Sequence, residues 1–80
     1  MPNSEFTISN RIRTLRFLAA EMTQKELADL VGVTRQTVNA VESNKYSPSL
    51  EVAFKISLVF KVPITDVFSY GTQPDGETIA

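Results

Sequence analysis

Residues 23–43 read TQKELADLVGVTRQTVNAVES, and this stretch decides the fold. Thr23 stands three residues before Glu26, which is the spacing of a reciprocal capping box, so the pattern predicts a helix that begins at Thr23. Its apolar stripe consists of Leu27, Ala28, Leu30 and Val31. We expect this helix to cover about residues 23–31 and to end at Gly32.

A second short helix is expected directly after a sharp turn. Gly32 can adopt the positive φ that ends the first helix and redirects the chain. Thr34 then offers the next N-cap, and the inward face of a helix over about residues 34–43 would carry Val38 and Val41. A small Ala28 allows the two helices to approach closely. Two short helices joined in this way form a helix-turn-helix unit.

Apolar spacing predicts three further helices outside this unit. One covers about residues 10–21, is capped by Ser9 or Asn10, and buries Ile12, Leu15, Leu18 or Ala19, and Met22. Another begins after Ser49 and carries Leu50, Ala53, Ile56, Ser57 and Phe60 along one side. Pro63 and the ITDVF segment predict one or two final helical turns. The predicted fold class is therefore all-α with five helices.

The two ends of the chain are less regular. EFTIS alternates Phe6 and Ile8 with polar residues, and VFSYG alternates Phe68 and Tyr70, so each segment could be a short strand buried on one face. The two strands could pair as a small antiparallel sheet, or the ends could be a disordered arm and a frayed terminus. We expect an N-terminal arm over 1–9, the folded domain over 10–70, and a disordered tail over 71–80.

Composition excludes several classes of protein. Eighty residues make a single domain, and the absence of cysteine and histidine excludes disulfides, the usual zinc ligands and an imidazole-based triad. Eight Lys and Arg against nine Asp and Glu give a net charge of -1, which argues against a polycation that coats nucleic acid. The chain shows no leader and no membrane span, so we expect a soluble cytoplasmic protein without a cofactor.

The second helix of the unit is polar where a core helix would be apolar. Arg35, Gln36 and Asn39 fall on its outer face. Arginine suits the O6 and N7 atoms of guanine, and glutamine or asparagine suits N6 and N7 of adenine. A polar run of this kind is also common at an ordinary solvated helix start, so the pattern by itself leaves both interpretations open.

The segment TQKELADLVGVTRQTVNAVESNKYSPSLEVAFKI, residues 23–56, resembles the lambda-repressor-type helix-turn-helix domain of the Xre-like regulators. The resemblance extends over about residues 10–68 and is strongest to short stand-alone members such as the cytolysin repressor of enterococci. Those members are dimeric repressors whose five helices are accompanied by a small sheet. This chain departs from the family pattern by one extra residue between Arg16 and Gln24, and by Asn44 where many members carry glycine.

The resemblance implies a role for individual residues. The recognition helix would read bases through Arg35, Gln36, Asn39 and Ala40. Contacts to the DNA backbone would come from Thr23, Gln24, Thr34, Thr37, Asn44, Lys45 and Tyr46. Arg16 and Glu42 resemble the ion pair that the family buries between its first and third helices.

One recognition helix reads only a few base pairs, so specific regulation calls for two copies on a symmetric operator. Apolar residues left over near the end of the fold are candidates for the two-fold interface, or could complete the monomer's own core: Phe60, Val62, Ile64, Phe68 and Tyr70. We therefore expect a non-enzymatic, homodimeric repressor that binds an inverted repeat in double-stranded DNA, with no evident small-molecule effector. The alternative is an antitoxin or adaptor that uses the same fold mainly to hold a protein partner.

Overall fold

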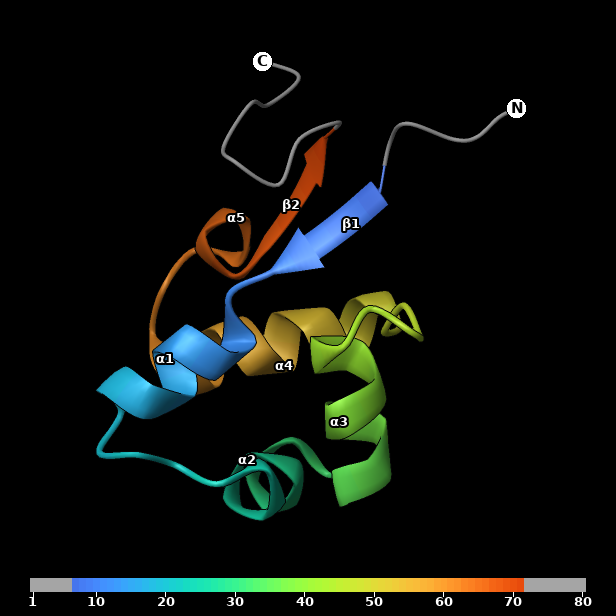
Figure 1. Ribbon diagram of the computed structural model, residues 1–80. Coiled ribbons are helices and arrows are strands. Elements are labelled where there is room, and N and C mark those ends of the chain that lie inside the picture. Colours follow the sequence, from blue (N-terminus) through green and yellow to red (C-terminus); the bar gives the residue numbers. More distant parts are fainter. Residues whose placement is uncertain (1–6, 72–80) are drawn as a thin grey trace.

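A computed structural model describes residues 7–71 and shows five helices with a two-stranded sheet (Figure 1). The elements, in chain order, are β1 (Thr7–Asn10), α1 (Ile12–Leu18), α2 (Gln24–Val31), α3 (Arg35–Glu42), α4 (Leu50–Phe60), α5 (Ile64–Val67) and β2 (Phe68–Gly71). The sheet lies on the opposite side of the molecule from α2, and α3 rises from the level of α2 toward the sheet. Within residues 7–71, no helix has the length and apolar character to cross a membrane.

The predicted caps are confirmed at three helix starts. At α2, the hydroxyl of Thr23 accepts from the Glu26 N–H at 3.0 Å and the Glu26 carboxylate accepts from the Thr23 N–H at 2.8 Å, which completes the capping box. Thr34 caps α3 and Ser49 caps α4 in the same acceptor role. Gly32 ends α2 with a φ of 88°, as its position predicted.

Helix α1 is shorter than predicted at both ends. Asn10 belongs to strand β1, so the helix begins only at Ile12. At the other end, Ala20 and Glu21 adopt φ values of 59° and 58°, in the left-handed region, and the helix stops at Leu18. These two consecutive left-handed residues lie in the connection where the resemblance implied one extra residue. Each of them carries backbone strain that a glycine would avoid.

The predicted pairing of the two ends is confirmed. Strands β1 and β2 are antiparallel, with Ile8 opposite Tyr70 and Asn10 opposite Phe68. The expected burial of one face is wrong for the outer pair, because Ile8 is 40% exposed and Tyr70 58% exposed. Phe68, at the end of the sheet nearest the helices, packs against the core. The predictions for Phe6 and for the tail beyond residue 71 lie outside the described residues.

The core is contributed by all five helices. Its buried members are Ile12, Leu27, Ala28, Val31, Val38, Val41, Ile56 and Val67. Two leucines that the spacing placed inward are exposed: Leu30 and Leu50. Of the two alternatives at the end of α1, Leu18 is exposed and Ala19 is half-buried, so Ala19 takes the inward position. Leu30 lies at the edge of its helical stripe. Leu50 does share a face with Ala53, but it lines an open groove.

Candidate nucleic-acid interface

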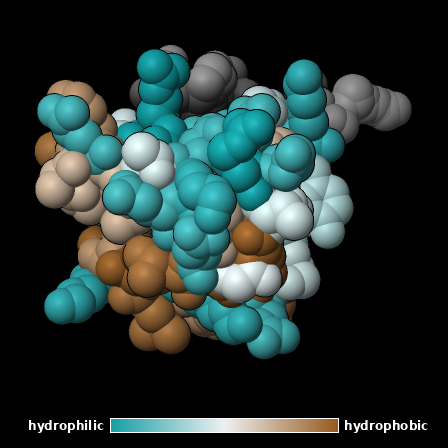
Figure 2. Space-filling view, turned by 90° about the horizontal axis from the view of Figure 1, so that it is seen from below, coloured by the Kyte–Doolittle hydropathy of each residue, from teal (hydrophilic) through white to brown (hydrophobic). Residues whose placement is uncertain are grey.

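Helices α2 and α3, with the turn at Gly32 between them, present the polar surface that the sequence singled out. Arg35, Gln36 and Asn39 are exposed along α3, and Ala40 is half-buried. Figure 2 looks at the molecule from below, on the side of α2. Hydrophilic residues cover the upper and central parts of this view, and hydrophobic residues gather at its lower left.

The first turn of α3 contains two residues that hydrogen-bond each other and two that do not take part in these bonds. Thr34 accepts from the Thr37 N–H at 3.1 Å, and the two hydroxyl oxygens lie 3.0 Å apart. Both threonines are therefore engaged in capping. Arg35 and Gln36, which lie between them, form no side-chain hydrogen bond or ion pair with any of residues 7–71. Their guanidinium and amide groups are available to a ligand.

Gln24, at the start of α2, points toward α3. Its amide nitrogen lies 3.2 Å from Oε1 of Glu42 and 3.5 Å from Oδ1 of Asn39. Both amide protons of Gln24 are thereby directed at α3, and the Asn39 nitrogen keeps its own protons for another acceptor. In this conformation, a phosphate near the start of α2 would meet the backbone N–H groups of the first turn rather than the Gln24 amide.

Arg16 and Glu42 form the expected ion pair, which joins α1 to the end of α3. The guanidinium donates from Nε to Oε2 at 2.5 Å and from Nη2 to Oε1 at 3.1 Å. The third donor, Nη1, binds the Met22 carbonyl at 2.7 Å. The two side chains are only 15% and 9% exposed. Pairing of this kind satisfies a carboxylate that would otherwise repel phosphates close to the recognition surface.

The loop after α3 carries the remaining predicted backbone contacts. Asn44 adopts a φ of 62°, in the left-handed region that asparagine tolerates better than most residues. The Lys45 N–H donates to the Ala40 carbonyl at 2.9 Å, so the loop is fixed to the last turn of α3. The side chains of Asn44, Lys45 and Tyr46 are exposed. Neither Arg35 nor Lys45 has an ion-pair partner within the described part of the chain.

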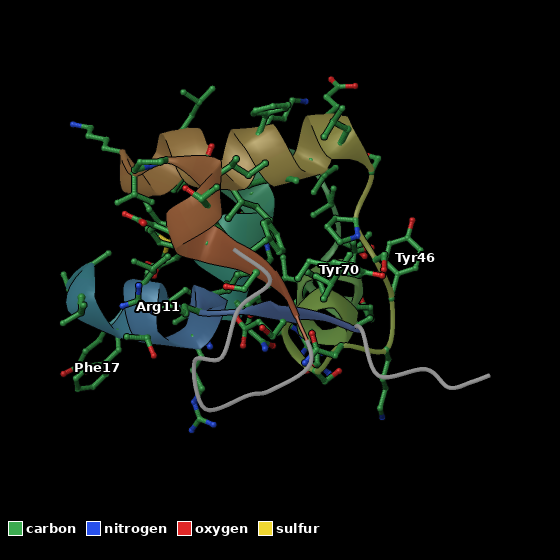
Figure 3. All side chains as sticks on the ribbon, turned by 90° about the horizontal axis from the view of Figure 1, so that it is seen from above. Arg11, Phe17, Tyr46 and Tyr70 are labelled. Atoms are coloured by element: carbon green, nitrogen blue, oxygen red, sulfur yellow. The ribbon has the colours of Figure 1, made fainter. Side chains whose placement is uncertain are left out.

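An apolar groove lies between the sheet and the start of α4. It has a volume of about 590 Å³ and is lined by Ile8, Pro48, Leu50, Ala53, Ile64, Thr65, Phe68, Ser69 and Tyr70. In Figure 3, Tyr70 and Tyr46 lie toward the same end of the molecule and Phe17 lies at the other. Three of the predicted interface residues, Ile64, Phe68 and Tyr70, line this groove. Phe60 and Val62 pack against the monomer's core and do not line the groove, whereas Phe68 does both.

Two features of the site escaped the sequence analysis. Leu50 was assigned to the core because its helical spacing matches that of Ala53. No local sequence signal shows whether another element packs against the first turn of a helix. Asn10 was considered only as a cap for the first helix. Its side chain also reaches α3, to the Val41 carbonyl 31 positions away in the sequence. A contact over that separation leaves no periodic pattern.

The arrangement defines a class of protein. Two short helices meet across a tight glycine turn, and the second presents free arginine and glutamine side chains from a firmly capped first turn. Lys45 follows in the loop and forms no ion pair with the residues that the structure describes. This is the architecture of a helix-turn-helix module that binds DNA.

Comparison with known proteins agrees with that class. The helix-turn-helix family model HTH_3 matches residues 12–67, and the chain belongs to this Xre-type family of DNA-binding transcriptional regulators, which are not enzymes. An uncharacterized HTH-type transcriptional regulator of Methanocaldococcus jannaschii is 46% identical over 63 residues, which cover 79% of this chain and 94% of the relative. The chain is also similar to the transcriptional repressor RstR of the cryptic phage CTXphi in Vibrio cholerae. That protein is 36% identical over 61 residues, covering 76% of this chain and 54% of the repressor.

The fold is shared with a solved structure. A candidate DNA-binding protein from Bacteroides fragilis superposes with a TM-score of 0.68 at 25% identity, over 79% of this chain and 100% of the other. The five-helix, lambda-repressor-like architecture with its small antiparallel sheet is therefore confirmed.

Proposed function

We propose that the protein is a homodimeric repressor that reads an inverted-repeat operator through the major groove, with α3 as the recognition helix. The observation that carries this proposal is the pair of uncommitted side chains, Arg35 and Gln36, on the rigid first turn of α3. The Thr34 cap fixes the backbone of this turn, so both side chains project from a rigid base.

The proposed base contacts follow from donor and acceptor geometry. Arg35 would bind O6 and N7 of guanine, and Gln36 would bind N6 and N7 of adenine. Asn39 would donate its amide protons to a base acceptor, because its oxygen is turned toward Gln24. The methyl group of Ala40 would meet a thymine methyl.

The proposed backbone contacts surround these residues. They come from Thr23, Gln24, Thr34, Thr37, Asn44, Lys45 and Tyr46. Thr23 and Thr34 each accept an N–H within their caps, and the Thr34 and Thr37 hydroxyls share one hydrogen bond. The Thr23 proton and one proton of the Thr34–Thr37 pair would therefore be donated to phosphate oxygens. For Gln24, the backbone N–H is the proposed donor.

The apolar groove supports the proposed two-fold interface. Its exposed apolar members, Ile8, Leu50 and Tyr70, form a surface of the kind that marks protein contacts. Ile8, which lines the groove, is two residues from Asn10, whose amide binds the Val41 carbonyl at the end of α3. Two copies joined at the groove would therefore place their recognition helices on either side of the dyad. We place the interface at Ile64, Phe68 and Tyr70, extended by Ile8 and Leu50, while Phe60 and Val62 complete the core.

Replacing Leu50 with aspartate tests this interface. Leu50 is 70% exposed and opens α4, where a carboxylate is well tolerated, so the monomer should fold normally. In a dimer the charge would be buried without a partner, which we expect to raise the dimer dissociation constant at least about 100-fold. Sedimentation velocity at micromolar concentration would then show a dimer for the parent chain and a monomer for the variant.

Leu58 provides the matched control, because it is 73% exposed on the same helix and lies outside the groove. Leu58→Asp should remain dimeric. A dimeric Leu50→Asp protein, or dissociation of both variants alike, would remove the groove from the proposal.

Salt dependence tests the backbone contacts. If each subunit neutralises about three phosphates, log affinity should fall with log salt concentration at a slope of about -5. Lys45→Ala should make this slope shallower by about 2 for the dimer and weaken operator and random duplexes alike. Lys55, which is paired with Glu51 at 3.2 Å on α4, is the control lysine, and Lys55→Ala should leave the slope unchanged. An equal change in both variants would contradict a phosphate contact at Lys45.

The remaining parts of the proposal concern the organisation of the chain. We propose residues 10–70 as the DNA-binding domain of a short regulator of the enterococcal cytolysin repressor type, between an arm over 1–9 and a tail over 71–80. Such a regulator acts in the cytoplasm of a bacterium or archaeon, where the operator is.

A further inference from the structure

Asn10 occupies the junction between the sheet and the helices. It is the last residue of β1 and pairs with Phe68 of β2. The next residue, Arg11, donates its backbone N–H to the Val67 carbonyl at 2.9 Å, so the strand is fastened to α5 as it enters α1. The backbone at Asn10 is therefore held on both sides.

The side chain of Asn10 binds two different helices. Its oxygen accepts from the Ile12 N–H at 3.0 Å and so caps the start of α1. Its nitrogen lies 3.0 Å from the Val41 carbonyl oxygen, 3.3 Å from that of Glu42 and 3.2 Å from Oδ1 of Asn44. A half-buried amide thereby joins the sheet to the last turn of α3.

The last turn of α3 needs such a donor. The final carbonyls of any helix lack partners within the helix and carry its partial negative charge. Here the loop supplies N–H groups to the carbonyls of Asn39, Ala40 and Val41. Within residues 7–71, the Glu42 carbonyl receives its side-chain donor from Asn10.

We propose that Asn10 is a positioning residue that fixes the recognition helix relative to the sheet, and thereby sets the spacing of the two recognition helices in the dimer. This inference rests on the proposed function, because the sheet carries Phe68 and Tyr70 of the proposed interface. A rigid link between that interface and α3 determines which half-site separation fits. Contacts within one monomer's helix-turn-helix unit cannot set this distance.

The test uses two variants that keep the cap on α1 and remove the donor to α3. Asn10→Asp preserves shape and places an acceptor against the carbonyls of α3. Asn10→Ser keeps a short acceptor, does not reach α3 and leaves the net charge unchanged. Ile56→Val is the control for general destabilisation, since it trims a residue that is 2% exposed in the core of α4.

The first readout is discrimination between half-site spacings. A duplex selected from a random library is compared with a duplex that has one base pair inserted between its half-sites. We expect both Asn10 variants to bind the selected duplex about tenfold more weakly and to lose at least about threefold in preference for the selected spacing. The control should keep the preference of the parent chain. Unchanged preference in both Asn10 variants would overturn the proposal.

The second readout needs no DNA. The N–H groups of Asn44 and Lys45 bind the Val41 and Ala40 carbonyls, so fraying of the last turn should speed their hydrogen exchange about tenfold relative to the Ala53 N–H of α4. Equally faster hydrogen exchange at all three N–H groups would show a global loss of stability, and would contradict a specific contact between Asn10 and α3. If the parent chain selects no duplex, the proposed function fails, whereas the exchange pattern still decides whether Asn10 holds α3.

Discussion

Gln36→Ala and Arg35→Ala are each expected to weaken operator binding by about 2 to 6 kcal/mol in the dimer, since each lost bidentate base contact costs about 1 to 3 kcal/mol per half-site. Both side chains are exposed and form no hydrogen bond or ion pair with residues 7–71, so the folded domain should be undisturbed. The loss should depend on sequence: the variant should no longer distinguish the parent base pair from its replacements at one position of each half-site. Fluorescence anisotropy on matched duplexes would measure both effects.

Arg13 supplies the charge-matched control, because it is an exposed arginine on α1 and not part of the proposed recognition helix. Arg13→Ala should change affinity slightly and leave specificity intact. The proposed readout would be contradicted if Arg13→Ala weakened binding as much as Arg35→Ala, or if either α3 variant lost affinity for all duplexes equally.

Glu42→Ala is expected to destabilise the fold by about 3 to 5 kcal/mol, which is a large part of the stability of a small domain. The change would leave the Arg16 guanidinium without its counterion in a site where that side chain is only 15% exposed. It would also release Gln24, which donates to the same carboxylate. Urea denaturation followed by circular dichroism would measure the loss as a shift of the midpoint.

Two comparisons separate the buried pair from charge effects in general. Arg16→Met combined with Glu42→Leu should recover most of the lost stability, because no buried charge remains unpaired. Asp29→Ala breaks the ion pair between Lys25 and Asp29, whose side chains are 66% and 63% exposed, respectively. This variant should lose less than about 1 kcal/mol of folding stability. A loss below 1 kcal/mol for Glu42→Ala would contradict the structural role assigned to this pair.

Helix starts could be predicted from the sequence because their causes are local. Thr23, Thr34 and Ser49 each bind an N–H three residues ahead, and Gly32 supplies the left-handed turn by itself. The pairing of the chain ends was open from the sequence. Alternation marked both segments as strands, but pairing depends on contacts between residues more than 50 positions apart, such as Ile8 and Tyr70.

Burial was harder to predict than secondary structure. Helical spacing places Leu50 on the same face of α4 as Ala53. Whether a residue on that face is buried depends on how far the neighbouring helices and strands extend along it. The early stop of α1 has a similar cause, since the two left-handed residues after it are stabilised by bonds such as that from Met22 N–H to the Arg16 carbonyl at 2.9 Å. The resemblance marked one extra residue in this connection, but Ala20 and Glu21 have no turn preference that would have located the bend.

For the candidate site, sequence identified the residues, and structure added their orientation. The exposed positions of Arg35 and Gln36 follow from helical geometry alone. The direction of the Gln24 amide, toward Asn39 and Glu42, depends on how closely α2 and α3 approach. The Asn10 amide likewise binds α3 through a contact between residues far apart in the sequence. Its hydrogen bonds to α3 could therefore be found only in the folded chain.

Selection of bound duplexes from a random library shows whether the protein is a dimeric, sequence-specific repressor. We expect enrichment of an inverted repeat whose half-sites are centred about one helical turn, roughly 10 base pairs, apart. Gln36→Ala should reduce the enrichment at one defined position in each half-site. Absence of any enriched sequence, with only weak salt-sensitive binding that Gln36→Ala leaves unchanged, would contradict the account and favour a module that holds a protein partner.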